Sequence, residues 1–88
     1  MGLQYDSAKA ASNFKKHGVS FADAEGVFYD PLALHCPDPD AHAEERFVAV
    51  GLGITDDVLV VVYTMRGEDI RLISARRATR QEIKSYEN

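Results

Sequence analysis

The first thirty residues space their apolar side chains as two consecutive helices would. Asp6 is a suitable N-cap for the alanine-rich segment 7–17, and Gly18 is a suitable residue to end it, after a last turn rich in cations. Ser20 begins a second, short helix, because Asp23 follows at the distance of a capping pair. The apolar residues that share one face of this second helix are Phe21, Ala24, Val27 and Phe28.

Three apolar runs follow: "RFVAVGLGIT", "VLVVVYTMR" and "DIRLISARR". The connectors "DD" and "GE" are short enough for tight hairpins, so the runs predict an antiparallel meander. A short edge strand near residues 32–36, before a proline-rich acidic loop, adds a fourth strand. With two-residue turns, the face expected to hold the helices carries Val48, Val50, Leu52, Leu59, Val61, Tyr63, Ile70 and Leu72. The opposite face would carry Ala49, Gly51, Gly53, Val62, Thr64, Arg71, Ile73, Ala75 and Arg77.

The last element is a helix that begins near Arg80, because Thr79 and Glu82 have the spacing of a capping box. The whole pattern predicts one α+β domain over residues 1–88. Two N-terminal helices pack on a four-stranded, mostly antiparallel sheet, and a C-terminal helix follows it.

Composition describes a small globular protein of 88 residues with a formal net charge of -4. Its N-terminus lacks a secretory pattern, no apolar run approaches the roughly 20 residues of a membrane span, and the single Cys36 cannot form an internal disulfide. A cytoplasmic location is therefore expected. The net acidity argues against nucleic-acid binding unless the cations cluster in space.

Two adjacent arginines, Arg76 and Arg77, end the last predicted strand just before the N-terminus of a helix. Free backbone N–H groups and the helix dipole already favour an anion there, so the pair suits a phosphate. The alternative is that both arginines simply pair with Asp or Glu side chains of the first half of the chain.

Three separated motifs resemble the BrnT toxins of bacterial type II toxin–antitoxin systems, in the same order along the chain. They are "KHGVSF" at 16–21, "ERF" at 45–47 and "RLISARRA" at 71–78, and the resemblance runs from about Tyr5 to Tyr86. It implies a RelE-like fold and an endoribonuclease that inhibits translation and arrests growth. It also implies a hetero-oligomer with a ribbon-helix-helix antitoxin of the BrnA type, which would make the contacts to DNA.

RNA cleavage without metal needs a base for the 2′-hydroxyl, a cation for the crowded phosphorane and an acid for the departing oxygen. The candidate catalytic residues are Arg71, Arg76, Arg77, His17 and Glu45. The candidate RNA-binding residues are Lys16, Arg46, Tyr63, Arg66 and Arg80, and Lys16 is also a candidate for proton transfer. No metal or other cofactor is expected.

Each candidate has a structural alternative. His17 could only satisfy the end of its helix, Tyr63 could pack in the core, and Arg46 could anchor the acidic loop. Two other functions stay open: a module that binds a partner without catalysis, and a metal site in the loop. The metal-capable residues of that loop are His35, Cys36, Asp38, Asp40, His42, Glu44 and Glu45, but their spacing fits no established zinc or calcium motif.

Overall fold

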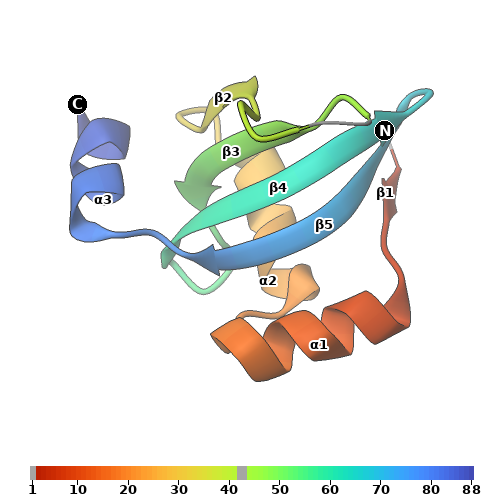
Figure 1. Cartoon of the computed structure of the whole chain (residues 1–88). Helices are drawn as coiled ribbons and strands as arrows, with labels where there is room; N and C mark the ends of the chain where they lie inside the picture. The colour runs from red at the N-terminus through yellow and green to blue at the C-terminus, as the bar shows by residue number, and fades with distance from the viewer. Residues whose placement is uncertain (1, 42–43) are drawn as a thin grey trace.

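The computed structural model describes residues 2–41 and 44–88 as an α+β fold (Figure 1). The elements in chain order are β1 (Leu3–Gln4), α1 (Ser7–His17), α2 (Phe21–Ala24), the 3-10 helix η1 (Glu25–Tyr29), β2 (Leu34–Pro37), β3 (Phe47–Leu52), β4 (Val58–Arg66), β5 (Asp69–Arg77) and α3 (Arg80–Glu87). The sheet has the order β1-β5-β4-β3-β2. It therefore has five strands, and the prediction of four was wrong, because the two residues of β1 are too few to show an alternating pattern.

The helix termini confirm the local predictions. Asp6 accepts a hydrogen bond from the backbone of Ala8, and Gly18 ends α1 in the left-handed conformation with φ 70°. Ser20 caps α2, which continues as η1, and Thr79 and Glu82 form the capping box of α3. No described helix is long and apolar enough to cross a membrane.

The turn between β4 and β5 has the predicted two residues, since Arg66 pairs with Asp69. The connection between β3 and β4 does not, because Leu52 pairs with Val58 and five residues lie between them. A two-residue turn at Asp56 and Asp57 would have paired Thr55 with Val58, so the predicted register of β3 is wrong by three residues. A shift by an odd number of residues exchanges the two faces of a strand. Ala49 and Gly51 therefore point into the core, while Val48, Val50 and Leu52 lie on the opposite face.

Two contacts explain this register. The side chain of Asp23 accepts hydrogen bonds from both the backbone and the hydroxyl of Thr55, which holds the longer loop against α2. A Cβ added at Gly51 would lie 3.0 Å from Val27 and 2.9 Å from Ala33, so only small residues fit where η1 crosses β3.

A β-bulge in β5 produces the second correction. Tyr63 pairs with Leu72, but Val62 pairs with Ser74, so Ile73 is an extra residue. Beyond Ile73 the faces of β5 are exchanged relative to the prediction. Ala75 is consequently buried in the core, and the expected placement of Arg71 and Arg77 on one face is wrong.

The core lies between α1, α2 and η1 on one side and the sheet on the other. Its buried members are Val19, Phe21, Ala24, Val27, Ala49, Leu59, Val61, Tyr63, Ile70, Leu72 and Ala75. In Figure 1, α1 lies below β5 and α2 lies behind the sheet, while α3 stands at one end of it. The opposite sheet face, called here the open face, lacks a helix along most of its length among the described elements.

Candidate functional site

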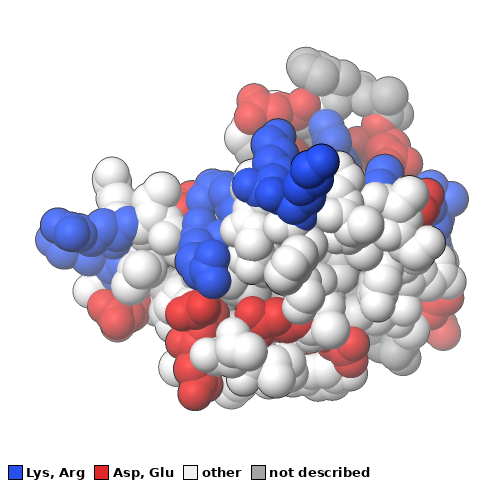
Figure 2. All heavy atoms as spheres, turned by 90° about the horizontal axis from the view of Figure 1, so that it is seen from below, with Lys and Arg blue, Asp and Glu red and all other residues white. Residues whose placement is uncertain are grey.

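Basic side chains gather on the face of the molecule that carries α1, although the chain is acidic overall (Figure 2). The helix α1 contains three lysines, ends in His17 and has no acidic residue between Ser7 and His17. Acidic side chains flank the basic ones in the same view. The cations therefore do cluster, as nucleic-acid binding by an acidic chain requires.

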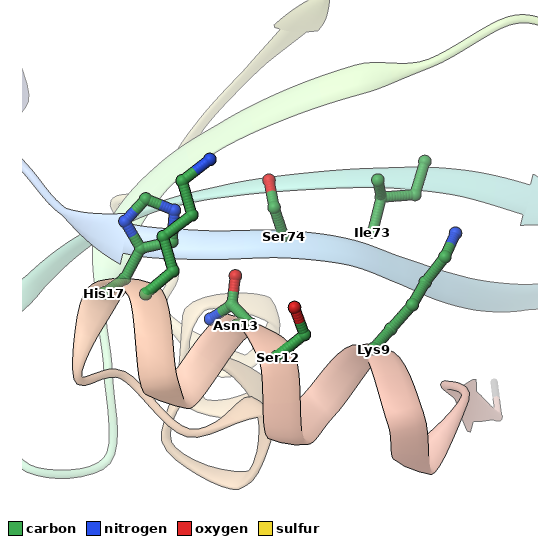
Figure 3. A pocket seen from close by; sticks show the side chains of 7 residues that line it. Lys9, Ser12, Asn13, His17, Ile73 and Ser74 are labelled. Atoms are coloured by element: carbon green, nitrogen blue, oxygen red, sulfur yellow. The ribbon is translucent and has the colours of Figure 1, made fainter.

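A groove of about 190 Å³ separates α1 from β5. It is lined by Lys9, Ser12, Asn13, Lys16, His17, Ile73 and Ser74. Figure 3 shows Lys9 and His17 at opposite ends of the helix, with Ser12 and Asn13 between them and Ser74 facing them from β5. The groove thus joins ammonium groups, an imidazole and hydroxyls in one place.

Asn13 fixes α1 against the strand that forms the other wall of the groove. Its side-chain amide donates hydrogen bonds to the carbonyls of Val19, at 3.0 Å, and Ala75, at 2.9 Å. Its side-chain oxygen accepts a third from the backbone N–H of Ala75 at 3.0 Å. Asn13 is buried, so these bonds are shielded from water, and they fix the position of α1 along β5.

Arg77 does not line the groove itself, but its guanidinium lies near the C-terminal end of α1. One guanidinium nitrogen is 3.6 Å from the position that a Cβ on Gly18 would occupy, so it adjoins the residue after His17. The same side chain forms an ion pair with Asp57, at 3.5 Å, in which both partners are more than half exposed. Such a pair is weak and readily exchanged for a ligand's anion.

Arg76 points to the other face of the sheet and is held there. Its guanidinium donates two hydrogen bonds of 2.9 Å to the two carboxylate oxygens of Glu82 on α3. Hydrogen bonds from Arg76 are the largest cause that lowers the pKa of Glu82 to about 2, and the same hydrogen bonds raise the pKa of Arg76. Arg76 therefore fastens α3 to the sheet. Its carboxylate partner, Glu82, lies in the second half of the chain, whereas the alternative considered from the sequence expected a partner in the first half.

Arg71 also lies on the open face, where it pairs across the strands with Thr64. It is half-buried, and it takes part in none of the ion pairs found among residues 2–41 and 44–88. The sequence-predicted arginines are thus divided: Arg77 adjoins the groove, while Arg71 and Arg76 occupy the open face.

Tyr63 is buried, and its hydroxyl lies 2.9 Å from Nδ1 of His35. Its ring stacks on Phe47, and burial raises the pKa of its hydroxyl. This geometry favours core packing over stacking on an RNA base.

The remaining candidates do not converge on the groove. Arg46 lies 3.9 Å from Asp38, which fits an anchor for the acidic loop. The backbone carbonyl of Glu45 accepts a hydrogen bond from Thr64. Arg66 ends β4 at the hairpin, and Arg80 opens α3 beside a shallow exposed depression.

In the proline-rich loop, His42 lies outside the described residues. Among the residues that are described, no three His, Cys, Asp or Glu side chains gather as a metal site would require. Cys36 is exposed, and His35 is engaged with Tyr63.

The sequence predictions missed Lys9, Ser12, Asn13 and Ser74 as groove residues. A signal for two of them, Lys9 and Asn13, was present in their spacing with the predicted Lys16. Lys9, Asn13 and Lys16 recur at four- and three-residue intervals, so they share one face of α1 with the polar Asn13 at its most buried position. A polar residue on the inward stripe of a helix needs a partner, and Asn13 has three.

The chain was compared with known proteins. The family model described as "Ribonuclease toxin, BrnT, of type II toxin-antitoxin system" matches residues 5–82. A search of curated proteins gave no match. The crystal structure of the Brucella abortus ribonuclease toxin BrnT superposes with a TM-score of 0.69 at 28% sequence identity, covering 91% of this chain and 99% of that one. The chain therefore belongs to the BrnT family of ribonuclease toxins of type II toxin–antitoxin systems.

Proposed function

We propose that the chain is an endoribonuclease toxin that cleaves RNA without a metal ion in the groove between α1 and β5. The observation that carries the proposal is the meeting of His17 and Lys16 in one groove, with the guanidinium of Arg77 next to Gly18. The imidazole of His17 can transfer a proton, and the side chains of Lys16 and Arg77 supply positive charge beside it. Proton transfer and positive charge are the two requirements of attack by a neighbouring 2′-hydroxyl.

In the proposed reaction, neutral His17 takes the proton of the 2′-hydroxyl as its oxygen bonds to phosphorus. Lys16 and Arg77 stabilise the negative charge of the phosphorane, and Arg77 can do so through two parallel hydrogen bonds. The bond from phosphorus to the 5′-oxygen then breaks, and that oxygen takes a proton from the Lys16 ammonium. The products are a 2′,3′-cyclic phosphate and a new 5′-hydroxyl end.

Ser74 extends this site toward the open face. It lines the groove, and it also pairs with Val62 on the open side of the sheet. An RNA strand that passes over Ser74 would bring its next phosphates toward Arg71. Arg71 is then an RNA-positioning residue in this proposal, and Arg76 serves as the anchor of α3.

The experiment is cleavage of a defined RNA oligonucleotide by purified protein in the presence of EDTA. We expect fragments ending in a cyclic phosphate, and growth arrest when the chain is expressed alone. Cleavage that stops with EDTA and returns with a divalent ion would contradict the metal-independent reaction.

The alternative of a partner-binding module without catalysis has one observation in its favour. Both adjacent arginines already have carboxylate partners, Glu82 for Arg76 and Asp57 for Arg77. Protein that arrests no growth and cuts no RNA, yet binds its antitoxin, would establish that alternative.

The family name implies an antitoxin, and we propose that it is of the BrnA ribbon-helix-helix type, with DNA contacts made through it. We also propose that RNA cleavage by the toxin takes place in the cytoplasm and inhibits translation. Recovery of the toxin alone after co-expression with the product of the adjacent gene would contradict the proposed pairing.

A further inference from the structure

The open face of the sheet consists of two cross-strand rows of side chains that change in character from one edge to the other. One row is Leu34, Val50, Val60 and Arg76, and the next is Cys36, Val48, Val62 and Ser74. Directly paired residues point to the same side of a sheet, so each row is a line of neighbouring side chains. Both rows are aliphatic on β3 and β4, begin with Leu34 or Cys36 on β2, and end in a cationic or polar residue on β5.

This face is only partly covered by the chain itself. In Figure 1 no described helix crosses in front of β4 and β5, because α1 and α2 lie below and behind them. The helix α3 contacts β3 and covers one end, where Val60 is 4% exposed. Val48 and Val62, in the second row, keep part of their surface in contact with solvent.

The packing of α3 shows which kinds of side chain bind to this face. The carboxylate of Glu82 accepts two hydrogen bonds from Arg76, and the neighbouring Ile83 is half-buried. Tyr86 adds a hydrogen bond from its hydroxyl to Asp30. A helix is thus held by one carboxylate on an arginine of β5, with apolar contact beside it.

A cation and aliphatic side chains recur on the rest of this face, where the described chain covers Thr64 through the backbone of Glu45 but leaves Val48 and Val62 partly exposed. Arg71 lies on the same face of β5, forms no ion pair among the described residues, and pairs with Thr64, which is two residues from the partly exposed Val62 along β4. Arg71 can contact a phosphate, but the aliphatic side chains beside it offer nothing to RNA, whose exposed groups are mostly phosphates and sugars. This surface suits a protein segment with apolar side chains and an acidic one.

We infer that the antitoxin docks on this open face, with aliphatic side chains on Val48 and Val62 and a carboxylate on Arg71. The inference rests on the proposed antitoxin and adds the surface and the chemistry of its binding segment. A segment in this position would lie beside Ser74 at the mouth of the groove. It would therefore exclude RNA from Arg71 without entering the groove itself.

Cys36 allows a test that needs no substitution on the proposed surface. It is the single cysteine of the chain, it is exposed, and it belongs to the second row. The rate of its alkylation by a maleimide would be followed by intact mass, with and without the antitoxin encoded beside the toxin. If only the free toxin reacts, antitoxin at about 100 times its Kd should slow labelling about 100-fold.

The matched control places the thiol on the other side of the molecule. In Cys36→Ser/Phe14→Cys the new thiol replaces an exposed side chain on α1, and its labelling rate should not change when antitoxin is added. Protection at position 14 with free labelling at Cys36 would place the antitoxin on the helix side and overturn the inference. Absence of any complex with the parent chain would overturn it too.

Affinity measurements test the two chemical elements separately. Val62→Glu should weaken antitoxin binding about 30-fold or more, and Phe14→Glu, which adds the same charge elsewhere, should not. Arg71→Glu should also weaken binding by at least about 30-fold, whereas the same exchange at exposed Arg66 should leave Kd within about twofold. Unchanged affinity in both folded open-face variants would refute the inference.

The RNA assay keeps this result separate from the proposed cleavage. A parent chain that binds antitoxin but cuts no RNA would refute the cleavage proposal and leave the docking surface supported. Folded Val62→Glu that binds antitoxin with parental Kd but no longer cuts RNA would instead assign the open face to RNA.

Discussion

Replacing Asn13 by alanine tests how the two walls of the groove are joined. The substitution removes one side chain that makes three hydrogen bonds of 2.9 to 3.0 Å, all between groups shielded from water. It leaves the N–H and carbonyl of Ala75 and the carbonyl of Val19 without these partners. The hydrogen bonds that join α1 to β5 through Asn13 and Ala75, two residues 62 positions apart in the chain, are lost.

The magnitude follows from opposing contributions. Each lost hydrogen bond removes about 1 kcal/mol of net stability, and buried groups left without partners add to the cost. Water entering from the adjacent groove relieves part of this, and alanine is the better helix former by about 0.5 kcal/mol. We expect a net loss of about 2 to 4 kcal/mol in the free energy of unfolding, or about 10 to 25 °C in Tm for a domain of this size.

Urea denaturation of Asn13→Ala beside Ser12→Ala supplies the assay. Ser12 is the neighbouring groove residue, is exposed and makes no hydrogen bond through its side chain among the described residues, so its variant should stay within about 0.5 kcal/mol of the parent. A loss below about 0.5 kcal/mol for Asn13→Ala would refute the structural argument. The expected fall in RNA cleavage, measured well below the variant's unfolding transition, reports misplacement of α1 separately from unfolding.

Three further predictions concern the charged groups. His17→Ala should lower the RNA cleavage rate about 10² to 10⁴-fold with Tm nearly unchanged, whereas Lys15→Ala, which lies outside the groove, should keep parental activity; equal rates would exclude His17 from catalysis. Arg77→Ala should lower cleavage about 10² to 10³-fold and stability by less than about 1 kcal/mol, with partial rescue by lysine, and parental cleavage would make its role structural. Glu82→Gln should cost about 1 kcal/mol or less at pH 7, because its pair with Arg76 is partly exposed. Since folding lowers the pKa of Glu82 from 4.5 to about 2, this contribution is present above pH 4.5 and lost as the pH falls toward 2, so parent and variant should converge there in urea midpoints.

The helices were predictable because their signals are local. Asp6 reaches a residue two positions away, and Thr79 and Glu82 satisfy each other across three. Interactions of this range depend on little besides the residues themselves, so the start of α1 and the start of α3 were confirmed.

The faces of the sheet were only partly predictable, because distant contacts decide them. The five-residue loop before β4 is held by Asp23, which lies 32 residues from Thr55. The bulge at Ile73 depends on the pairing of two whole strands. Neither the hydrophobic pattern nor the turn residues contain that information, and each error of one or three positions exchanges the faces beyond it.

The same reason limited the prediction of the site. His17 and Lys16 were selected by residue type and resemblance, and the structure brings both to the groove. Asn13 was missed because its partners on β5 are 62 residues away. The assignment of Arg71 and Arg77 to one face failed with the register on which it depended.

The bulge gives the two adjacent arginines different surroundings. Without the extra residue at Ile73, Arg77 would share the open face with Arg71, and Arg76 would point toward α1. With it, Arg76 reaches Glu82 and holds α3, while Arg77 lies beside Gly18 at the end of α1. The bidentate, partly buried pair is the stronger of the two, and the exposed pair with Asp57 is the one that a phosphate can replace at small cost. One inserted residue therefore separates an arginine that holds α3 from one that is placed for the proposed contact with RNA.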